Sequence, residues 1–124
     1  MSKSTLGWTD IPVLDLNRAI AFYSGMLSAP TMKVNIGPGM DIGILPDSET
    51  GPSGCLYVAD DNAPSVTGPL IYLSVEGRLA AALAFVQDHG GKIITDRHQI
   101  GPHGYRGIVL DSEGNRIALH SDAP

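Results

Sequence analysis

Apolar residues recur at helical spacing in two stretches of the chain. The first set is Leu16, Ala19, Ile20, Tyr23 and Leu27. The second set is Leu79, Ala82, Leu83 and Val86, and it is followed by Gly90-Gly91 as a stop signal. Steps of three and four residues place such side chains on one face of an amphipathic helix. Asp15 suits an N-cap, because its carboxylate can accept from the free N–H groups of the first turn. The spacing predicts helices over residues 16–27 and 78–89.

A short apolar strand pattern precedes each predicted helix, at residues 7–13 and again at 69–75. The two halves are in register, since Val13 aligns with Val75 and Tyr23 with Phe85, each pair 62 positions apart in a chain of 124 residues. Strand-like segments separated by Gly, Pro and Asp follow each helix. They are residues 31–36, 40–45 and 54–59 in the first half and 92–98, 105–110 and 115–120 in the second. Each half therefore predicts the order β-α-β-β-β.

Polar stretches without periodicity separate these segments. We expect a hairpin loop at residues 46–52 and a linker between the halves at 60–69. The sequence Asp111-Ser-Glu-Gly-Asn115 predicts a tight turn in which Gly114 supplies a positive φ, and we assign it a structural role. The expected organisation is one domain over residues 1–124, with module one at about 5–60 and module two at about 68–121.

Composition excludes several classes of function. The chain is 43% hydrophobic and 17% charged, enough for a packed core, and its net charge is −5 without any basic cluster. Nucleic acid and anionic membrane surfaces are therefore not expected partners. Cys55 is the only cysteine, and no apolar run approaches the length of a membrane helix. We expect a soluble, cytoplasmic protein.

Several motifs together carry a family resemblance. They are residues 11–23 (IPVLDLNRAIAFY), 79–91 ending in His-Gly-Gly, 100–104 (IGPHG) and 111–121 (DSEGNRIALHS). In order and spacing they resemble the glyoxalase/bleomycin-resistance/extradiol dioxygenase family of the vicinal oxygen chelate superfamily. The resemblance implies an α+β fold in which two paired βαβββ modules form a cupped eight-stranded mixed sheet around a cavity, with the helices outside. It also implies a homodimer.

The resemblance further implies a divalent metal, held by His or Glu side chains on the opening and closing strands of the modules. The corresponding positions here fall on Trp8, on or near Leu70, and on Ala118, none of which can coordinate a metal. Cys55 and Tyr57 lie near the closing strand of module one, but a lone thiolate does not make a site. We therefore expect no metal cofactor, and activity cannot be inherited from the fold alone.

Alternation along the strands predicts which side chains face the cavity. If Ile11, Val13 and their counterparts pack under the helices, the opposite face carries apolar and aromatic groups with a few polar ones. The candidate ligand-binding residues are Trp8, Asp10, Leu70, Tyr72, Arg116 and His120, with His103 in a loop at the cavity mouth.

Each candidate also has a structural interpretation. Trp8 can be a packing residue that fills the lost metal position rather than a stacking wall. Asp10 and Arg116 can pair with each other at a strand end. His120 can be a surface or dimer-interface residue rather than a general base, and the loop that holds His103 can be a lid or a plain surface loop. His89 fits a helix C-terminus, and His98 a strand end.

Three functions remain open at this point. The first is a metal-free binding protein that holds a planar or aromatic small molecule, for which the acidic balance suits a cation. The second is an enzyme of lyase, isomerase or dioxygenase type, either with a rearranged metal site recruiting His103, His120 and Asp10, or with metal-free acid–base catalysis by His120 or Tyr72. The third is an interaction module with a vestigial cavity.

Overall fold

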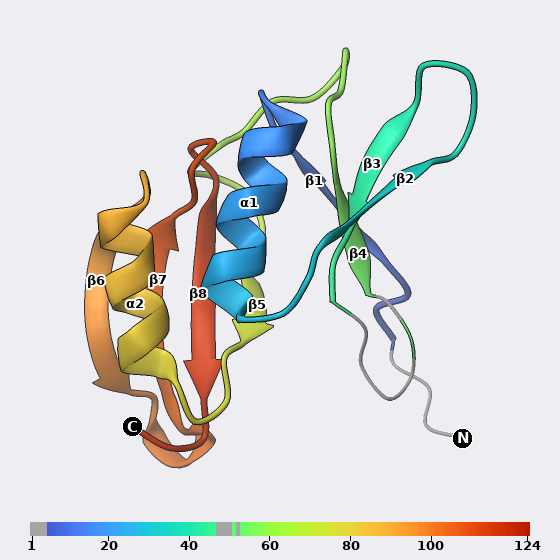
Figure 1. Cartoon of the computed structure of the whole chain (residues 1–124). Helices are drawn as coiled ribbons and strands as arrows, with labels where there is room; N and C mark the ends of the chain where they lie inside the picture. The colour runs from blue at the N-terminus through green and yellow to red at the C-terminus, as the bar shows by residue number, and fades with distance from the viewer. Residues whose placement is uncertain (1–4, 47–50, 52) are drawn as a thin grey trace.

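The computed structural model describes residues 5–46, 51 and 53–124, and it contains the predicted repeat of β-α-β-β-β (Figure 1). The first module consists of β1 (Thr9–Pro12), α1 (Leu16–Leu27), β2 (Met32–Asn35), β3 (Asp41–Ile44) and β4 (Gly54–Tyr57). The second consists of β5 (Ile71–Ser74), α2 (Leu79–Asp88), β6 (Lys92–Gln99), a 3₁₀ turn (Gly101–His103), β7 (Tyr105–Leu110) and β8 (Arg116–Ser121). Most of the loop predicted at 46–52 lies outside the described residues. No helix in the described ranges is long and apolar enough to cross a membrane.

The helix predictions are confirmed to within one residue at each end. The Asp15 carboxylate accepts from the backbone N–H of Arg18 at 3.0 Å, which is the predicted N-cap. The buried residues of α1 are Ala19, Phe22, Tyr23 and Met26. Ala19 and Tyr23 belong to the predicted stripe, and its other members, Leu16, Ile20 and Leu27, are half-buried against the core.

The strands form two four-stranded mixed sheets, ordered β1-β4-β3-β2 and β5-β8-β7-β6. In each sheet the first and last strands of the module are parallel neighbours and the other pairs are antiparallel. The α+β class and the two modules are therefore confirmed. The sheets are separate, however, and within the described residues no ladder joins them into the predicted eight-stranded sheet.

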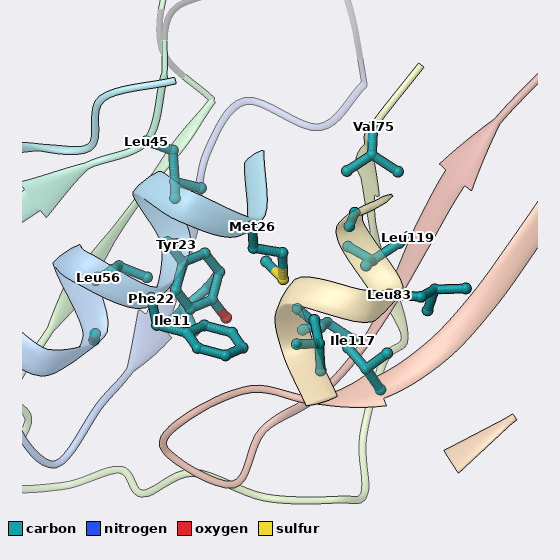
Figure 2. Packing of buried hydrophobic residues seen from close by; sticks show 14 of the residues in the cluster. Ile11, Phe22, Tyr23, Met26, Leu45, Leu56, Val75, Leu83, Ile117 and Leu119 are labelled. Atoms are coloured by element: carbon teal, nitrogen blue, oxygen red, sulfur yellow. The ribbon is translucent and has the colours of Figure 1, made fainter. Parts of the chain in front are cut away.

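The sheets stay apart because the two helices pack against each other between them (Figure 1). Gly25 makes this contact possible, since a Cβ at that position would lie 2.1 Å from Cζ of Phe85. The Arg78 guanidinium also donates to the Met26 carbonyl at 2.8 Å. One core cluster contains residues of both modules, including Ile11, Tyr23 and Met26 from the first and Leu83 and Ile117 from the second (Figure 2). The faces opposite the helices therefore point away from each other.

The turn at residues 111–115 does more than reverse the chain. Gly114 has the predicted positive φ, of 100°. The Tyr23 hydroxyl of module one donates to the buried Asp111 carboxylate at 2.5 Å. The buried Glu113 carboxylate accepts from two Arg18 nitrogens at 2.8 Å and from the backbone N–H groups of Leu14 and Asp15 at 2.9 Å. The turn of module two is thus bonded to the start of α1.

Candidate functional site

A pocket of about 580 Å³ lies on the outer face of the first sheet, and its lining includes Leu16, the first residue of α1. Its wall combines aromatic and aliphatic side chains with two carboxylates and contains no basic residue. The lining residues are Trp8, Asp10, Leu16, Ile36, Gly39, Met40, Asp41, Ile42, Cys55, Tyr57 and Val58. Apolar walls with a few polar groups are characteristic of small-molecule sites.

Asp10 is held in this pocket by two donors. The Trp8 indole N–H donates to Asp10 Oδ1 at 2.7 Å, and the Cys55 thiol donates to the same oxygen at 3.3 Å. Asp10 and Cys55 come together because β1 and β4 are parallel neighbours and these two residues lie opposite each other. These contacts fix the carboxylate, and Oδ2 has no hydrogen-bond partner among the described residues, so this oxygen is available to a ligand.

The Cys55 thiol is a donor and not a nucleophile. Burial raises the pKa of Cys55, and the hydrogen bond to Asp10 and the charge of Asp10 raise it further, to about 11. A thiol with this pKa is protonated at neutral pH, and only the thiolate attacks electrophiles or binds metals well.

Trp8 is 44% exposed and therefore does not fill a buried position. Its indole forms part of the pocket wall, as one of the two sequence-based interpretations requires. The second carboxylate of the pocket, Asp41, is already engaged: it accepts from the Asn35 amide at 2.9 Å and lies 3.9 Å from the Lys33 ammonium. Asp10 is thus the carboxylate of the pocket without a cationic partner among the described residues.

The remaining predicted residues lie on the second sheet. Tyr72 and His120 share its outer face, with ring centroids 6.4 Å apart, and Tyr72 is 43% exposed. Leu70 precedes β5 and is half-buried. The candidate set is therefore divided between the two modules within one chain.

The predicted pairing of Asp10 with Arg116 is wrong. Arg116 donates from its guanidinium to the Gly68 carbonyl at 3.1 Å, and Asp10 lies on the other sheet, bonded to Trp8 and Cys55. The helices between the sheets keep the two strand ends apart.

The histidines divide in a similar way. His103 is exposed in the 3₁₀ turn, and its backbone carbonyl, not its ring, lies 2.6 Å from His120 Nε2. His89 caps α2 and stacks on Phe85 with centroids 3.8 Å apart, in keeping with a structural role. His98 lies on β6 and contacts Arg106.

Sequence reasoning missed Asp41, Met40 and Ile36 as pocket residues and Arg106 on the second sheet. The first three belong to the β2–β3 hairpin, and a strand pattern gives no sign of how far a hairpin folds over a neighbouring face. Cys55 and Tyr57 could have been found, because the alternation that places Asp10 on the outer face also places its neighbours on the parallel strand there.

The metal that the family resemblance implies does not fit the residues present. The Trp8 nitrogen carries a hydrogen that it donates to Asp10, and Leu70 and Ala118 offer no lone pair. A different group, Glu76, His120 and Asp122, has potential ligand atoms within 4.8 Å of one another. The Glu76 carboxylate there accepts from the backbone N–H of Asp122 at 2.7 Å and from Ser121 Oγ at 3.1 Å.

Several solved structures with the same fold are named as glyoxalase/bleomycin resistance or related resistance proteins. A glyoxalase/bleomycin resistance protein from Albidiferax ferrireducens has a TM-score of 0.70 at 17% identity, over 95% of this chain and 98% of that chain. A glyoxalase/bleomycin resistance protein/dioxygenase family enzyme from Burkholderia phytofirmans has a TM-score of 0.69 at 13% identity, over 95% and 98%. The fosfomycin resistance protein FosX from Listeria monocytogenes has a TM-score of 0.68 at 16% identity, over 97% and 94%.

The chain therefore shares the fold of these glyoxalase/bleomycin-resistance proteins, which is the fold that the sequence motifs imply. No protein-family model matches the sequence, and a search of curated proteins finds no match. At sequence identities below one fifth, these structures establish the fold only. The function must therefore be inferred from the chemistry of the site.

Proposed function

We propose that this protein binds a planar organic cation in the pocket on the outer face of β1 and β4. The observation that carries the proposal is the position of Asp10, a carboxylate without a cationic partner in an apolar wall that contains no basic residue. An amidinium, guanidinium or ammonium group fits such an anion, because Asp10 is exposed and a hydrogen bond between two charged groups is stronger than one between neutral groups.

The aromatic side chains of the wall support the same class of ligand. Trp8 and Tyr57 both line the pocket, and the faces of such rings attract cations. The Trp8 and Cys55 donors hold Asp10 in place before a ligand arrives, which reduces the ordering cost of binding.

Binding in this pocket needs no metal. The donors and acceptors that face the small molecule are those of Asp10 and its neighbours. The positions that the resemblance implies for metal-coordinating side chains hold Trp8, Leu70 and Ala118, which do not coordinate a metal. We propose a cytoplasmic location for the same protein, on the sequence evidence above.

The experiment is a calorimetric titration with benzamidine, benzamide and benzoate, three ligands of similar shape and different charge. Benzamidine should bind about tenfold more tightly than benzamide, the usual worth of one charge-assisted contact. Asp10→Asn should remove that difference, whereas Asp41→Asn should change it less, because Asp41 already pairs with Lys33. Equal binding of benzamidine and benzamide to the wild type, or a preference for benzamidine that survives Asp10→Asn, would overturn the proposal.

The second candidate is a metal-dependent enzyme, which one observation favours: the grouping of Glu76, His120 and Asp122. Metal analysis of protein purified without chelators or an affinity tag separates the two candidates. One equivalent of metal that disappears in His120→Ala would favour the enzyme. Less than about a tenth of an equivalent would favour the binding protein.

We also propose a homodimer. The β2–β3 hairpin exposes a group of large apolar side chains, which a partner copy could cover. They are Met32, Val34, Ile36 and Met40, with exposed fractions between 39% and 58%. Light scattering at tens of micromolar should give twice the chain mass, and Met32→Glu with Val34→Glu should give the mass of one chain. A monomeric wild-type mass would exclude this assembly.

A further inference from the structure

The outer face of the second sheet carries a row of polar side chains at one level. His98 on β6 is directly opposite Arg106 on β7, Arg106 is opposite His120 on β8, and His120 is opposite Ser74 on β5. Direct cross-strand partners point to the same face. The next residue along, Gly107, faces α2, since a Cβ there would lie 2.7 Å from Leu83. The row therefore lies on the face away from the helices.

Arg106 is held at the centre of this row by neutral partners. Its Nε donates to His98 Nε2 at 3.0 Å, and its Nη1 donates to the Tyr72 hydroxyl. Because an arginine can only donate, His98 Nε2 is the acceptor and carries no hydrogen. The opposite ring nitrogen, Nδ1, then donates to the Asp96 carbonyl at 3.0 Å, which fixes the ring. The guanidinium is thus oriented by groups that do not neutralise it.

No carboxylate of the described residues pairs with Arg106. The ion pairs found among the described residues join Arg18 to Glu113 and Lys33 to Asp41, away from this face. Two carboxylates, Glu76 and Asp122, lie near the row beside His120. The Glu76 oxygens accept from the backbone N–H groups of Asp122 and Ala123 and from Ser121 Oγ. Arg106 is half-buried, its guanidinium is held in one orientation, and no anion pairs with it. An ordinary surface arginine is instead mobile and surrounded by water.

We propose that Arg106, with the Tyr72 hydroxyl, forms an oxyanion site on the outer face of the second sheet, and that its ligand is a carboxylate. Three of the five guanidinium N–H groups remain after the bonds to His98 and Tyr72. The Tyr72 hydroxyl accepts from Arg106, so its own hydrogen remains available to donate to a ligand. A planar carboxylate matches this arrangement through two parallel N–H···O bonds. The site is separate from the Asp10 pocket, which lies on the other sheet and takes the opposite charge.

The test follows the Arg106 Nε–H signal by NMR during titration with sodium acetate, and separately with inorganic phosphate, at constant ionic strength set with chloride. We expect a saturable shift with acetate at concentrations below about 100 mM. Arg106→Gln should abolish saturation of the neighbouring backbone signals, and Arg106→Lys should weaken binding about tenfold, because a lysine keeps the charge but loses the oriented pair of donors. Tyr72→Phe should weaken it about threefold.

Arg97→Gln is the matched control. Arg97 precedes His98 on β6, is exposed, and lies toward α2 beside Leu83. Its loss removes the same charge from the opposite face and should leave acetate binding within about twofold of wild type. Absence of a saturable shift in the wild type, or equal weakening by Arg97→Gln, would overturn the proposal. Tighter binding of phosphate than of acetate would overturn the assignment to a carboxylate. Benzamidine binding at Asp10 is measured independently, so failure of either site leaves the other testable.

Discussion

The outer faces of the two modules have the same backbone plan and opposite chemistry. Asp10 on β1 is paired with Cys55 on β4, and the corresponding pair in the second module is Tyr72 with Ala118. On the neighbouring antiparallel strands, Val34 opposite Ile42 corresponds to His98 opposite Arg106. The first face is apolar around a carboxylate, and the second is polar around a guanidinium.

The inner faces, by contrast, repeat the same packing. A Cβ on Gly43 of β3 would lie 2.8 Å from Ile20 of α1, and a Cβ on Gly107 of β7 would lie 2.7 Å from Leu83 of α2. In each module the helix thus packs closely against a glycine of the third strand. Packing against a helix restricts side-chain volume at every inner position, whereas an outer position needs only to suit its ligand or solvent.

Filling these glycines should break the inner faces in both modules alike. Gly43→Val and Gly107→Val should each lower the free energy of unfolding by about 3 kcal/mol, because the helix must move or its side chain must leave its rotamer. Urea denaturation measures the effect. Gly7→Val is the control, since nothing lies within 4 Å of a Cβ there. A loss confined to one module would contradict the equivalence.

The contact between the modules should depend on pH through Glu113. Burial alone would raise the pKa of Glu113, but hydrogen bonds from Arg18, Ser112 and the backbone N–H groups of Asp15 and Leu14 outweigh it and lower the pKa to about 2. The stabilisation is therefore complete above the ordinary pKa of 4.5 and is lost as the pH falls from there through 2.

Glu113→Gln should accordingly cost about 2 kcal/mol at pH 7, the worth of hydrogen bonds to a charged group, and progressively less toward pH 2. Thermal unfolding of both proteins across this range measures the difference. A cost that stays constant with pH would show that the charge of Glu113 does not stabilise the fold.

An outer position should tolerate truncation that an inner one does not. Trp8→Ala should lower the free energy of unfolding by about 1 kcal/mol, because the indole is 44% exposed. Its inner neighbour along the sequence, Ile11, is 3% exposed, and Ile11→Ala should cost about 3 kcal/mol. If Trp8→Ala lowers the free energy of unfolding by about 4 kcal/mol, as the loss of a buried tryptophan does, Trp8 is a core residue and not part of the pocket wall.

The smallest effect concerns the reactivity of the Cys55 thiol. With a pKa of about 11, Cys55 should react slowly with iodoacetamide at pH 8. Asp10→Asn removes the negative charge beside the thiol and should accelerate alkylation, while burial continues to hold the pKa of Cys55 above its ordinary value. Unchanged alkylation would mean that Asp10 does not act on this thiol.

The sequence predicts the inner half of this molecule well and the outer half only in part. Helical spacing, the Asp15 cap and the 62-residue repeat depend on local chemistry, so both modules and their buried faces follow from it. The separation of the sheets rests on contacts between α1 and α2, such as Gly25 against Phe85, which no local pattern encodes. For the same reason, alternation identifies Trp8, Asp10 and Tyr72 as outer residues. It does not show that Tyr72 lies on a different sheet from the other two. The bonds of Glu113 to Arg18 and of Arg106 to His98 likewise join residues that are distant in sequence or separated by a bulge.

Acrylamide quenching of Trp8 fluorescence, with and without benzamidine, tests the central claim that the acidic pocket of the first module is a cation site. Trp8 is the only tryptophan of the chain, so its signal has a single source. We predict that acrylamide quenches the free protein, that saturating benzamidine protects the indole, and that Asp10→Asn removes the protection without changing quenching of the free protein. If acrylamide quenches Trp8 equally well without benzamidine and with benzamidine at about a hundredfold its calorimetric Kd, the pocket is not a cation site.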